Sequence, residues 1–180
     1  MIAKAQKKQM TICITGLDLS AAFDTIKRDE LLNILGTIIG DDEVRMIRLL
    51  LSNTTLDVKM SDAETQPFKS NVGSPQGDAI SGVLFNIYLE DALRRVRTAL
   101  NSNDTDIEHS YTLPRSSIPS EMCYADDSDY PTTDTTRKEE ILAVAYQILP
   151  ERNLKVNQDK TEHTIIKREE NVHSSETRRI

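Results

Sequence analysis

The apolar segment at residues 11–19 carries an ionisable side chain, Asp18, at its end. The run is short and rich in β-branched residues, which predicts a buried strand. Asp18 shares a face of that strand with Ile12 and Ile14, because alternate residues point the same way. A carboxylate there must be solvated at the strand tip, paired with a cation or bound to a metal ion. An ordinary strand-end or helix-capping aspartate is the alternative reading.

The rest of the sequence alternates between helical and strand patterns. Apolar residues three or four apart indicate helices, and short alternating runs indicate strands. Helices are expected at residues 27–35, from 41, from about 78 to 100, and at 136–150. Strands are expected at 121–124, 154–156 and 164–166, with a half-buried hairpin formed by 56–60 and 65–70. This order predicts an α+β fold with helices packed on one face of a sheet.

Changes in composition along the chain predict its domain organisation. The 180 residues, 38% of them hydrophobic, suit one domain with a buried core, which we place at residues 11–166. Residues 1–10 form an N-terminal extension. Residues 101–120 are polar and contain two prolines, which is typical of a flexible insertion. The charged residues 167–180 are expected to be a disordered tail. Thr136 and Glu139 have the spacing of a helix capping box.

Charge and cysteine content narrow the class of protein. The formal net charge is −7, which counts against tight nucleic-acid binding by this chain alone, because lysine and arginine supply phosphate affinity. The two cysteines, Cys13 and Cys123, are too few for a disulfide framework or a zinc site, so both are expected to be buried in strands. The sequence contains neither a bilayer-length apolar run nor a secretory signal. We therefore expect an intracellular protein without a membrane partner.

Two adjacent carboxylates, Asp126 and Asp127, follow the predicted strand at 121–124. Adjacent strand residues point to opposite faces, so both reach one site only at a tight turn. An Asp-Asp turn is common by itself. If Asp18 lies on a neighbouring strand, the three carboxylates form a cluster that repels itself unless divalent cations neutralise it. Such hard oxygen ligands suit Mg²⁺, and two ions of this kind support in-line phosphoryl transfer.

Four segments resemble the motifs of one enzyme family, in the family's order. LDLSAAFD at residues 17–24 resembles motif A of reverse transcriptases, and SPQGD at 74–78 resembles motif B. YADD at 124–127 is motif C of that family, and LKVNQDKTE at 154–162 resembles motif D. The resemblance spans roughly residues 11–166. The amino-acid sequences of these motifs are most similar to those of non-LTR (LINE-like) retrotransposon and group II intron enzymes.

The resemblance implies an RNA-directed DNA polymerase that adds a dNTP to a DNA primer on an RNA template. It implies a polymerase palm, a ferredoxin-like (RRM-like) antiparallel sheet with helices on one face, part of the fingers and no thumb. Asp18 and Asp126 would bind two Mg²⁺ ions, for which Mn²⁺ is a possible substitute. The Leu19 carbonyl would be a third ligand, and Asp127 would support them. The ions would activate the primer 3′-hydroxyl and stabilise the triphosphate.

The same resemblance implies residues that select the nucleotide. Phe23 matches the gate whose ring blocks a ribose 2′-hydroxyl; a core aromatic is the alternative. Tyr124 would pack beside the primer end, unless it is a core strand residue. Lys160 would lie near the leaving pyrophosphate as a general acid, unless it is an ordinary surface lysine. Three residues that otherwise form a simple turn would line the nascent base pair: Pro75, Gln76 and Gly77.

The chain also departs from the family pattern. Upstream fingers and downstream thumb regions are expected to be missing, which predicts that the chain alone is inactive. Pro131 follows YADD where an apolar strand is usual, and proline cannot donate a ladder hydrogen bond, so we expect a short or distorted hairpin. Asn153 precedes Leu154 in place of a motif D glycine, a mild change.

Other classes of protein remain as alternatives. A degenerate retroelement remnant would keep the fold as a non-catalytic nucleic-acid-binding or scaffold module. An RNA-dependent RNA polymerase would share the palm, but Phe23 at the sugar gate argues against it. An acidic Ca²⁺-binding domain would need denser oxygen-ligand loops than the sequence contains.

Overall fold

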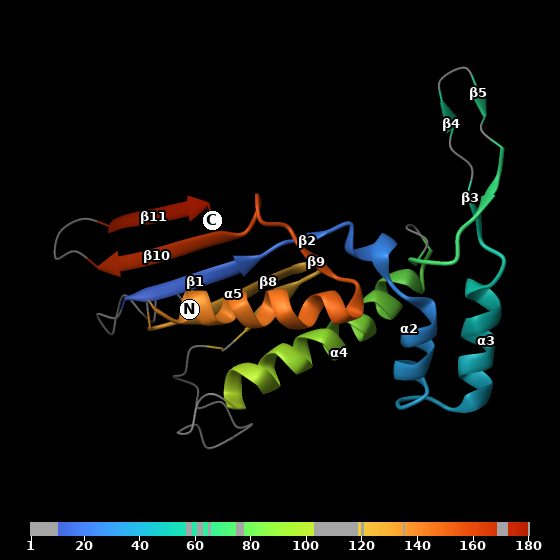
Figure 1. Cartoon of the computed structure of the whole chain (residues 1–180), viewed down its shortest axis with the longest axis horizontal. Helices are drawn as coiled ribbons and strands as arrows, with labels where there is room; N and C mark the ends of the chain where they lie inside the picture. Colours follow the sequence, from blue (N-terminus) through green and yellow to red (C-terminus); the bar gives the residue numbers. More distant parts are fainter. Residues whose placement is uncertain are drawn as a thin grey trace.

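A five-stranded antiparallel sheet with strand order β11-β10-β1-β8-β7 forms the centre of the fold (Figure 1). The computed structural model describes residues 11–56, 59–60, 63–64, 66–74, 78–102, 119, 121–134, 136–168 and 173–179. The strands are β1 (Ile12–Leu17), β7 (Met122–Tyr124), β8 (Asp127–Thr132), β10 (Glu162–Arg168) and β11 (His173–Arg179). The predicted first strand is therefore the central strand of the sheet.

The register of the sheet brings the end of β1 beside the start of β8. Leu17 pairs with Ser128, and Gly16 pairs with Asp129 on one side and with Glu162 on the other. Continuing the β1–β8 register by one residue would set Asp18 opposite Asp127. Two segments far apart in the sequence thus deliver carboxylates to one end of the same strand pair.

The two faces of the sheet differ in chemistry. Leu17 and Tyr130 face the helices and belong to the buried core. The same core contains side chains of α4 (Ser81–Ser102) and α5 (Arg137–Ile148), which lie on one side of the sheet (Figure 1). Gly16 and Asp129, at alternate positions, face the other way. The expected α+β fold with helices on one face is confirmed in this coarse sense.

Helices α2 (Arg28–Leu35) and α3 (Asp41–Leu51) begin within one residue of their expected positions. Helix α4 begins at Ser81 rather than near Asp78. The predicted capping box at α5 is wrong, because Thr136 makes no side-chain cap hydrogen bond. Asp134 Oδ1 instead accepts hydrogen bonds from the Thr136 amide and hydroxyl, at 2.8 and 2.7 Å. The Asp134 side chain therefore stabilises the turn that precedes α5.

Short elements surround the central sheet. β2 (Leu19–Ser20) pairs with β9 (Lys155–Val156), and two 3₁₀ turns are η1 (Ala22–Thr25) and η2 (Leu149–Arg152). The arm in Figure 1 contains β3 (Thr55–Leu56), β4 (Lys59–Met60), β5 (Ala63–Glu64) and β6 (Phe68–Lys69). The hairpin expected there exists, but β3 and β6 are exposed rather than half-buried. Their short ladder projects away from the sheet and has no core to cover it.

Three further expectations have different outcomes in the structure. The β7–β8 hairpin is short, as expected, with three residue pairs, but Pro131 is not the cause, because β8 extends to Thr132 and Pro131 pairs with Ile14. The described ladder with β7 ends at Asp129, so Pro131 lies beyond it. The expected disordered tail contains β11, which pairs along β10. Cys13 is buried as expected, whereas Cys123 is exposed.

Most of the expected insertion at 101–120 lies outside the described residues. Within the described part of the chain, every helix is too short or too polar to cross a bilayer.

Candidate active site

Asp18 lies at the break between β1 and β2. Its carbonyl accepts a hydrogen bond from the Asn157 amide at 2.8 Å, which ties motif A to motif D. The side chain is 20% exposed, and its Oδ1 lies 3.7 Å from Lys160 Nζ. Its Oδ2 is buried and has no hydrogen-bond partner among the residues that the structure describes. A desolvated carboxylate oxygen without a partner is unfavourable, so this atom marks a position suited to a cation.

A cavity of about 390 Å³ opens on the sheet face that the helices leave uncovered. We call it the carboxylate cavity; its lining residues are Ile14, Gly16, Leu17, Asp18, Asp127, Asp129, Lys160, Glu162, Thr164 and Ile166. Gly16 lines the cavity. A Cβ atom at this position would lie only 3.0 Å from Asp129 Oδ1. The small residue in the central strand therefore leaves room for the neighbouring carboxylate.

Two carboxylates line this cavity that the sequence patterns did not identify as site residues, Asp129 and Glu162. Burial, together with the charge of Asp127, raises the pKa of Asp129 above its usual value. Asp127 and Asp129 are alternate residues of one strand and therefore point to the same face. From this alternation, Asp129 could have been predicted to lie on the same face as Asp127. Glu162 comes to the cavity only through the pairing of β10 with β1, which the sequence does not reveal.

The expected cluster of Asp18, Asp126 and Asp127 is only partly assembled. Asp18 and Asp127 line the carboxylate cavity, whereas Asp126 is not among its lining residues. Asp126 occupies the turn between β7 and β8, with Ala125 before it at a φ of 53°. In the described part of the chain, no group of three His, Cys, Asp or Glu side chains is placed to hold a metal ion.

The donor chemistry of the cavity nevertheless fits Mg²⁺. Four carboxylates contribute to its lining, and Asp18 Oδ2 among them is buried without a partner. Magnesium prefers oxygen ligands and usually keeps several waters, so it needs only one or two protein carboxylates. The residues present are therefore compatible with the metal chemistry that the motifs imply.

Tyr124 and Lys160 lie at the surface around this site. Tyr124 is 85% exposed, so the alternative that it is a core aromatic is excluded. It pairs with Asp127 across the hairpin and so stands at the end of β7 next to the turn. The Lys160 side chain is 68% exposed, yet it reaches Asp18 and lines the carboxylate cavity. Both side chains are accessible to a ligand at this edge of the molecule.

Phe23 lies at the other side of motif A, in η1. Its ring stacks on Phe85 of α4, with ring centroids 4.1 Å apart and planes 21° apart. The ring is half-buried, so it is packed against the core and still has a free edge. The Phe23 carbonyl accepts a hydrogen bond from the Ser74 amide at 2.9 Å. Motif A and the residue that opens motif B are thus in direct contact.

The three motif B residues Pro75, Gln76 and Gly77 lie outside the described residues. Their neighbours on either side, Ser74 and Asp78, are described.

Comparison with known proteins agrees with the sequence motifs. Residues 2–177 match the family model described as reverse transcriptase (RNA-dependent DNA polymerase). No match was found among curated protein sequences. The match covers nearly the whole chain, so the chain belongs to the reverse transcriptase family. RNA-directed DNA polymerase is the activity of that family.

Solved telomerase structures share the fold. Apo telomerase from Candida tropicalis, truncated from the C-terminal domain, gives a TM-score of 0.61 at 15% identity, covering 91% of this chain and 33% of that one. Candida tropicalis telomerase in complex with a TWJ fragment of telomeric RNA gives 0.63 at 15% identity, covering 91% and 27%. The chain therefore spans about a third or less of these proteins.

Proposed function

We propose that the chain is the palm of an RNA-directed DNA polymerase that joins a dNTP to the 3′-hydroxyl of a DNA primer on an RNA template. The observation that carries this proposal is the buried, unpartnered Asp18 Oδ2 beside Lys160 in the carboxylate cavity of a reverse transcriptase family member. The RNA fragment bound to the telomerase of similar fold supports RNA as a partner.

Two Mg²⁺ ions, or Mn²⁺ in their place, are the proposed cofactors, as is general in this family. Asp18, Asp126 and Asp127 would hold them, with the Leu19 carbonyl as a further ligand. When bound, such ions lower the pKa of the attacking hydroxyl and neutralise charge on the triphosphate. Asp127 and Asp18 line one cavity, which supports their pairing as ligands. Asp126 adjoins Asp127 in the hairpin turn.

The remaining residues have proposed roles in substrate selection. Phe23, with its ring held against Phe85, would exclude a ribose 2′-hydroxyl. Tyr124, exposed at the end of β7, would contact the primer end. Lys160, beside Asp18, would donate a proton to the leaving pyrophosphate. The segment of Pro75, Gln76 and Gly77 would line the nascent base pair.

The parent protein is proposed to be a retroelement enzyme, of the non-LTR or group II intron type that the motif wording favours. The chain spans a third or less of the telomerases that share its fold. Fingers and thumb regions of the parent would therefore complete the substrate channel. On this basis the isolated chain would be inactive, and its net charge of −7 leaves phosphate binding to those regions.

A non-catalytic remnant, acting as a nucleic-acid-binding or scaffold module, is the second candidate function. The observation that favours it is that the described side chains do not form a complete metal-binding group. Such a remnant would keep the fold of the family without binding Mg²⁺ at Asp18.

Metal titration distinguishes the two functions. Mg²⁺ or Mn²⁺ is titrated into the chain and into Asp18→Ala and Asp126→Ala, with binding followed by calorimetry and stability by thermal melting. Asp42→Ala is the matched control, since the Asp42 side chain is 91% exposed on α3. Binding that is lost in both site variants and kept in the control supports the polymerase palm. Equal behaviour of all four proteins supports the remnant.

A further inference from the structure

Arg28, the first residue of α2, binds four backbone carbonyls with one guanidinium. Its Nη1 donates to Leu51 at 2.6 Å and to Ser70 at 2.8 Å. Its Nε donates to Gly73 at 2.9 Å, and its Nη2 donates to Val72 at 3.2 Å. The described residues give it no carboxylate partner. This arginine therefore acts as a geometric clamp on the chain, since its planar fork satisfies several acceptors at fixed angles.

Three of these carbonyls belong to residues 70–74, which we call the 70–74 loop. On its other side this loop is bonded to motif A. The Gly73 amide donates to the Ile26 carbonyl at 2.8 Å, and the Ser74 amide donates to the Phe23 carbonyl at 2.9 Å. An isolated bridge also joins Lys27 to Val72. The loop is thus held between the Arg28 side chain and the backbone of η1.

Gly73 makes this contact possible. Its φ is +75°, a conformation that residues with a Cβ rarely adopt. A Cβ there would lie 3.0 Å from the Phe23 carbonyl oxygen and 3.0 Å from both Cα and the carbonyl oxygen of Asp24. These are backbone atoms, which have little freedom to move. The 70–74 loop therefore lies directly against the residue proposed as the sugar gate.

We propose that Arg28 is a positioning residue for nucleotide selection. It fixes the 70–74 loop, and through that loop the Phe23 backbone. The Phe23 ring is fixed separately, by its stacking on Phe85. The inference rests on the proposed function and adds a specificity device to it. Arg28 itself has no contact with Asp18 or the carboxylate cavity, so its loss should alter sugar selection and leave metal binding intact.

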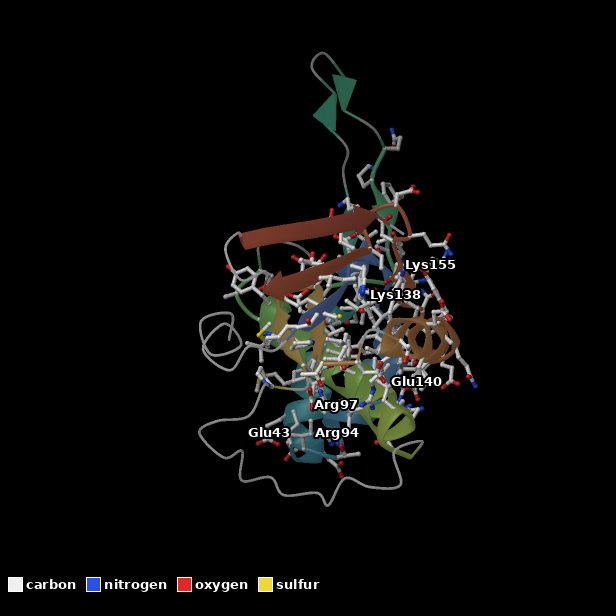
Figure 2. The ribbon with its side chains drawn as sticks, turned by 90° about the vertical axis from the view of Figure 1, so that its left-hand side faces the viewer. Glu43, Arg94, Arg97, Lys138, Glu140 and Lys155 are labelled. Carbon is white, nitrogen blue, oxygen red and sulfur yellow. The ribbon has the colours of Figure 1, made fainter. Side chains whose placement is uncertain are left out.

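Two substitutions test the two sides of this contact. Arg28→Lys keeps the charge but replaces the planar fork by a point charge, which cannot satisfy four carbonyls at these angles. Gly73→Ala strains the loop from the motif A side. Arg94→Lys is the matched control, because the Arg94 side chain is 71% exposed and bonds only to Glu90 within the described residues. Figure 2 shows Arg94 on α4, away from the sheet.

The first measurement is amide hydrogen exchange at Gly73 and Ser74, with thermal melting to verify that each variant folds. Losing charge-assisted hydrogen bonds should speed exchange at both amides by about tenfold or more in Arg28→Lys. Arg94→Lys should exchange like the parent. Unchanged exchange at both amides in folded Arg28→Lys would overturn the clamp, whatever the activity of the protein.

The second measurement is the ratio of dATP to ATP affinity in the presence of Mg²⁺. Arg28→Lys and Gly73→Ala should each lower this ratio severalfold while the affinity for Mg²⁺ alone stays at the parent value. An unchanged ratio in both variants, with faster exchange, would leave Arg28 a purely structural residue and overturn the inference. A parent that does not bind Mg²⁺ would overturn the proposed function, and the inference with it; a parent that binds Mg²⁺ but does not favour dATP over ATP would overturn the inference alone. Preserved selection in the parent and both variants would overturn the inference alone.

Discussion

Lys160 and Asp18 form an ion pair within the carboxylate cavity, with Nζ 3.7 Å from Oδ1. Lys160 is the one cation among the described residues that line it. In the absence of metal ions it partly neutralises the carboxylates, and it competes with any divalent cation for them.

Lys160→Met should therefore raise the affinity for Mg²⁺ a fewfold, as measured by calorimetry. The free energy of unfolding should change by less than about 0.5 kcal/mol, because the Lys160 side chain is 68% exposed and solvent weakens its pair with Asp18. Lys69→Met, at an exposed position on β6, is the control. An unchanged Mg²⁺ affinity in Lys160→Met would contradict this account of the ion pair.

Asp18→Asn should stabilise the metal-free chain. The substitution removes a charge whose Oδ2 is buried without a partner among the described residues. This gain outweighs the loss of the pair with the largely exposed Lys160 side chain, so we expect a net stabilisation of about 1 kcal/mol in denaturant titrations without metal. Added Mg²⁺ should stabilise the parent and not the variant. A less stable metal-free variant would show that Asp18 is structurally satisfied.

Asp129→Asn should change the pH dependence of stability. The folded state raises the pKa of Asp129 above its ordinary value of 3.8, through burial and the charge of Asp127. The folded state therefore binds the proton more tightly, and stability is lost as the pH rises from 3.8 through the raised pKa. The variant should lack this loss and melt at a higher temperature than the parent at pH 7. Parallel pH profiles of melting temperature would contradict the prediction.

Ala125→Gly should stabilise the β7–β8 hairpin. Ala125 has a φ of 53°, which is unfavourable for a residue with a Cβ. Glycine adopts it freely, so the free energy of unfolding should rise by up to about 1 kcal/mol. Ala99→Gly, inside α4, is a control of opposite sign, with an expected loss of about 1 kcal/mol. Chemical denaturation measures both.

Arg152→Met should destabilise the fold strongly. The Arg152 side chain is 15% exposed and pairs with Glu30 at 3.0 Å and Asp91 at 2.7 Å, which joins η2 to α2 and α4. Removing it takes away one of two cations that pair with each of these half-buried carboxylates, at a cost of about 2 kcal/mol, because Glu30 keeps Lys27 and Asp91 keeps Arg95. Arg94→Met should cost less than about 0.5 kcal/mol, since that arginine is exposed. Similar losses in the two variants would show that the Arg152 network is not special.

Local patterns predicted the elements whose stabilisation is local. The apolar spacing of Leu31, Leu32 and Leu35 marked α2, and all three are buried. The β-branched run marked β1 as a core strand. The family itself was evident from four motifs, and the match over residues 2–177 confirms it.

What could not be predicted depends on pairing between distant segments. β11 is charged and polar, and its backbone pairs along β10, which amino-acid composition does not encode. Glu162 reaches the carboxylate cavity only because β10 lies beside β1. Arg28 could not be identified from the sequence, because its four acceptors are backbone carbonyls, which every residue has.

The position of β7 allows the candidate site to open locally while the rest of the fold stays intact. β7 has three residues and, among the described strands, lies at the edge of the sheet and pairs only with β8. Edge segments with few partners open at a lower free energy than central strands. Peeling of β7 would release Asp126 and Tyr124 while the ladder of β1, β8 and β10 stayed closed. Under the proposed function, loss of the site can therefore arise as local fraying of β7 that melting curves do not register.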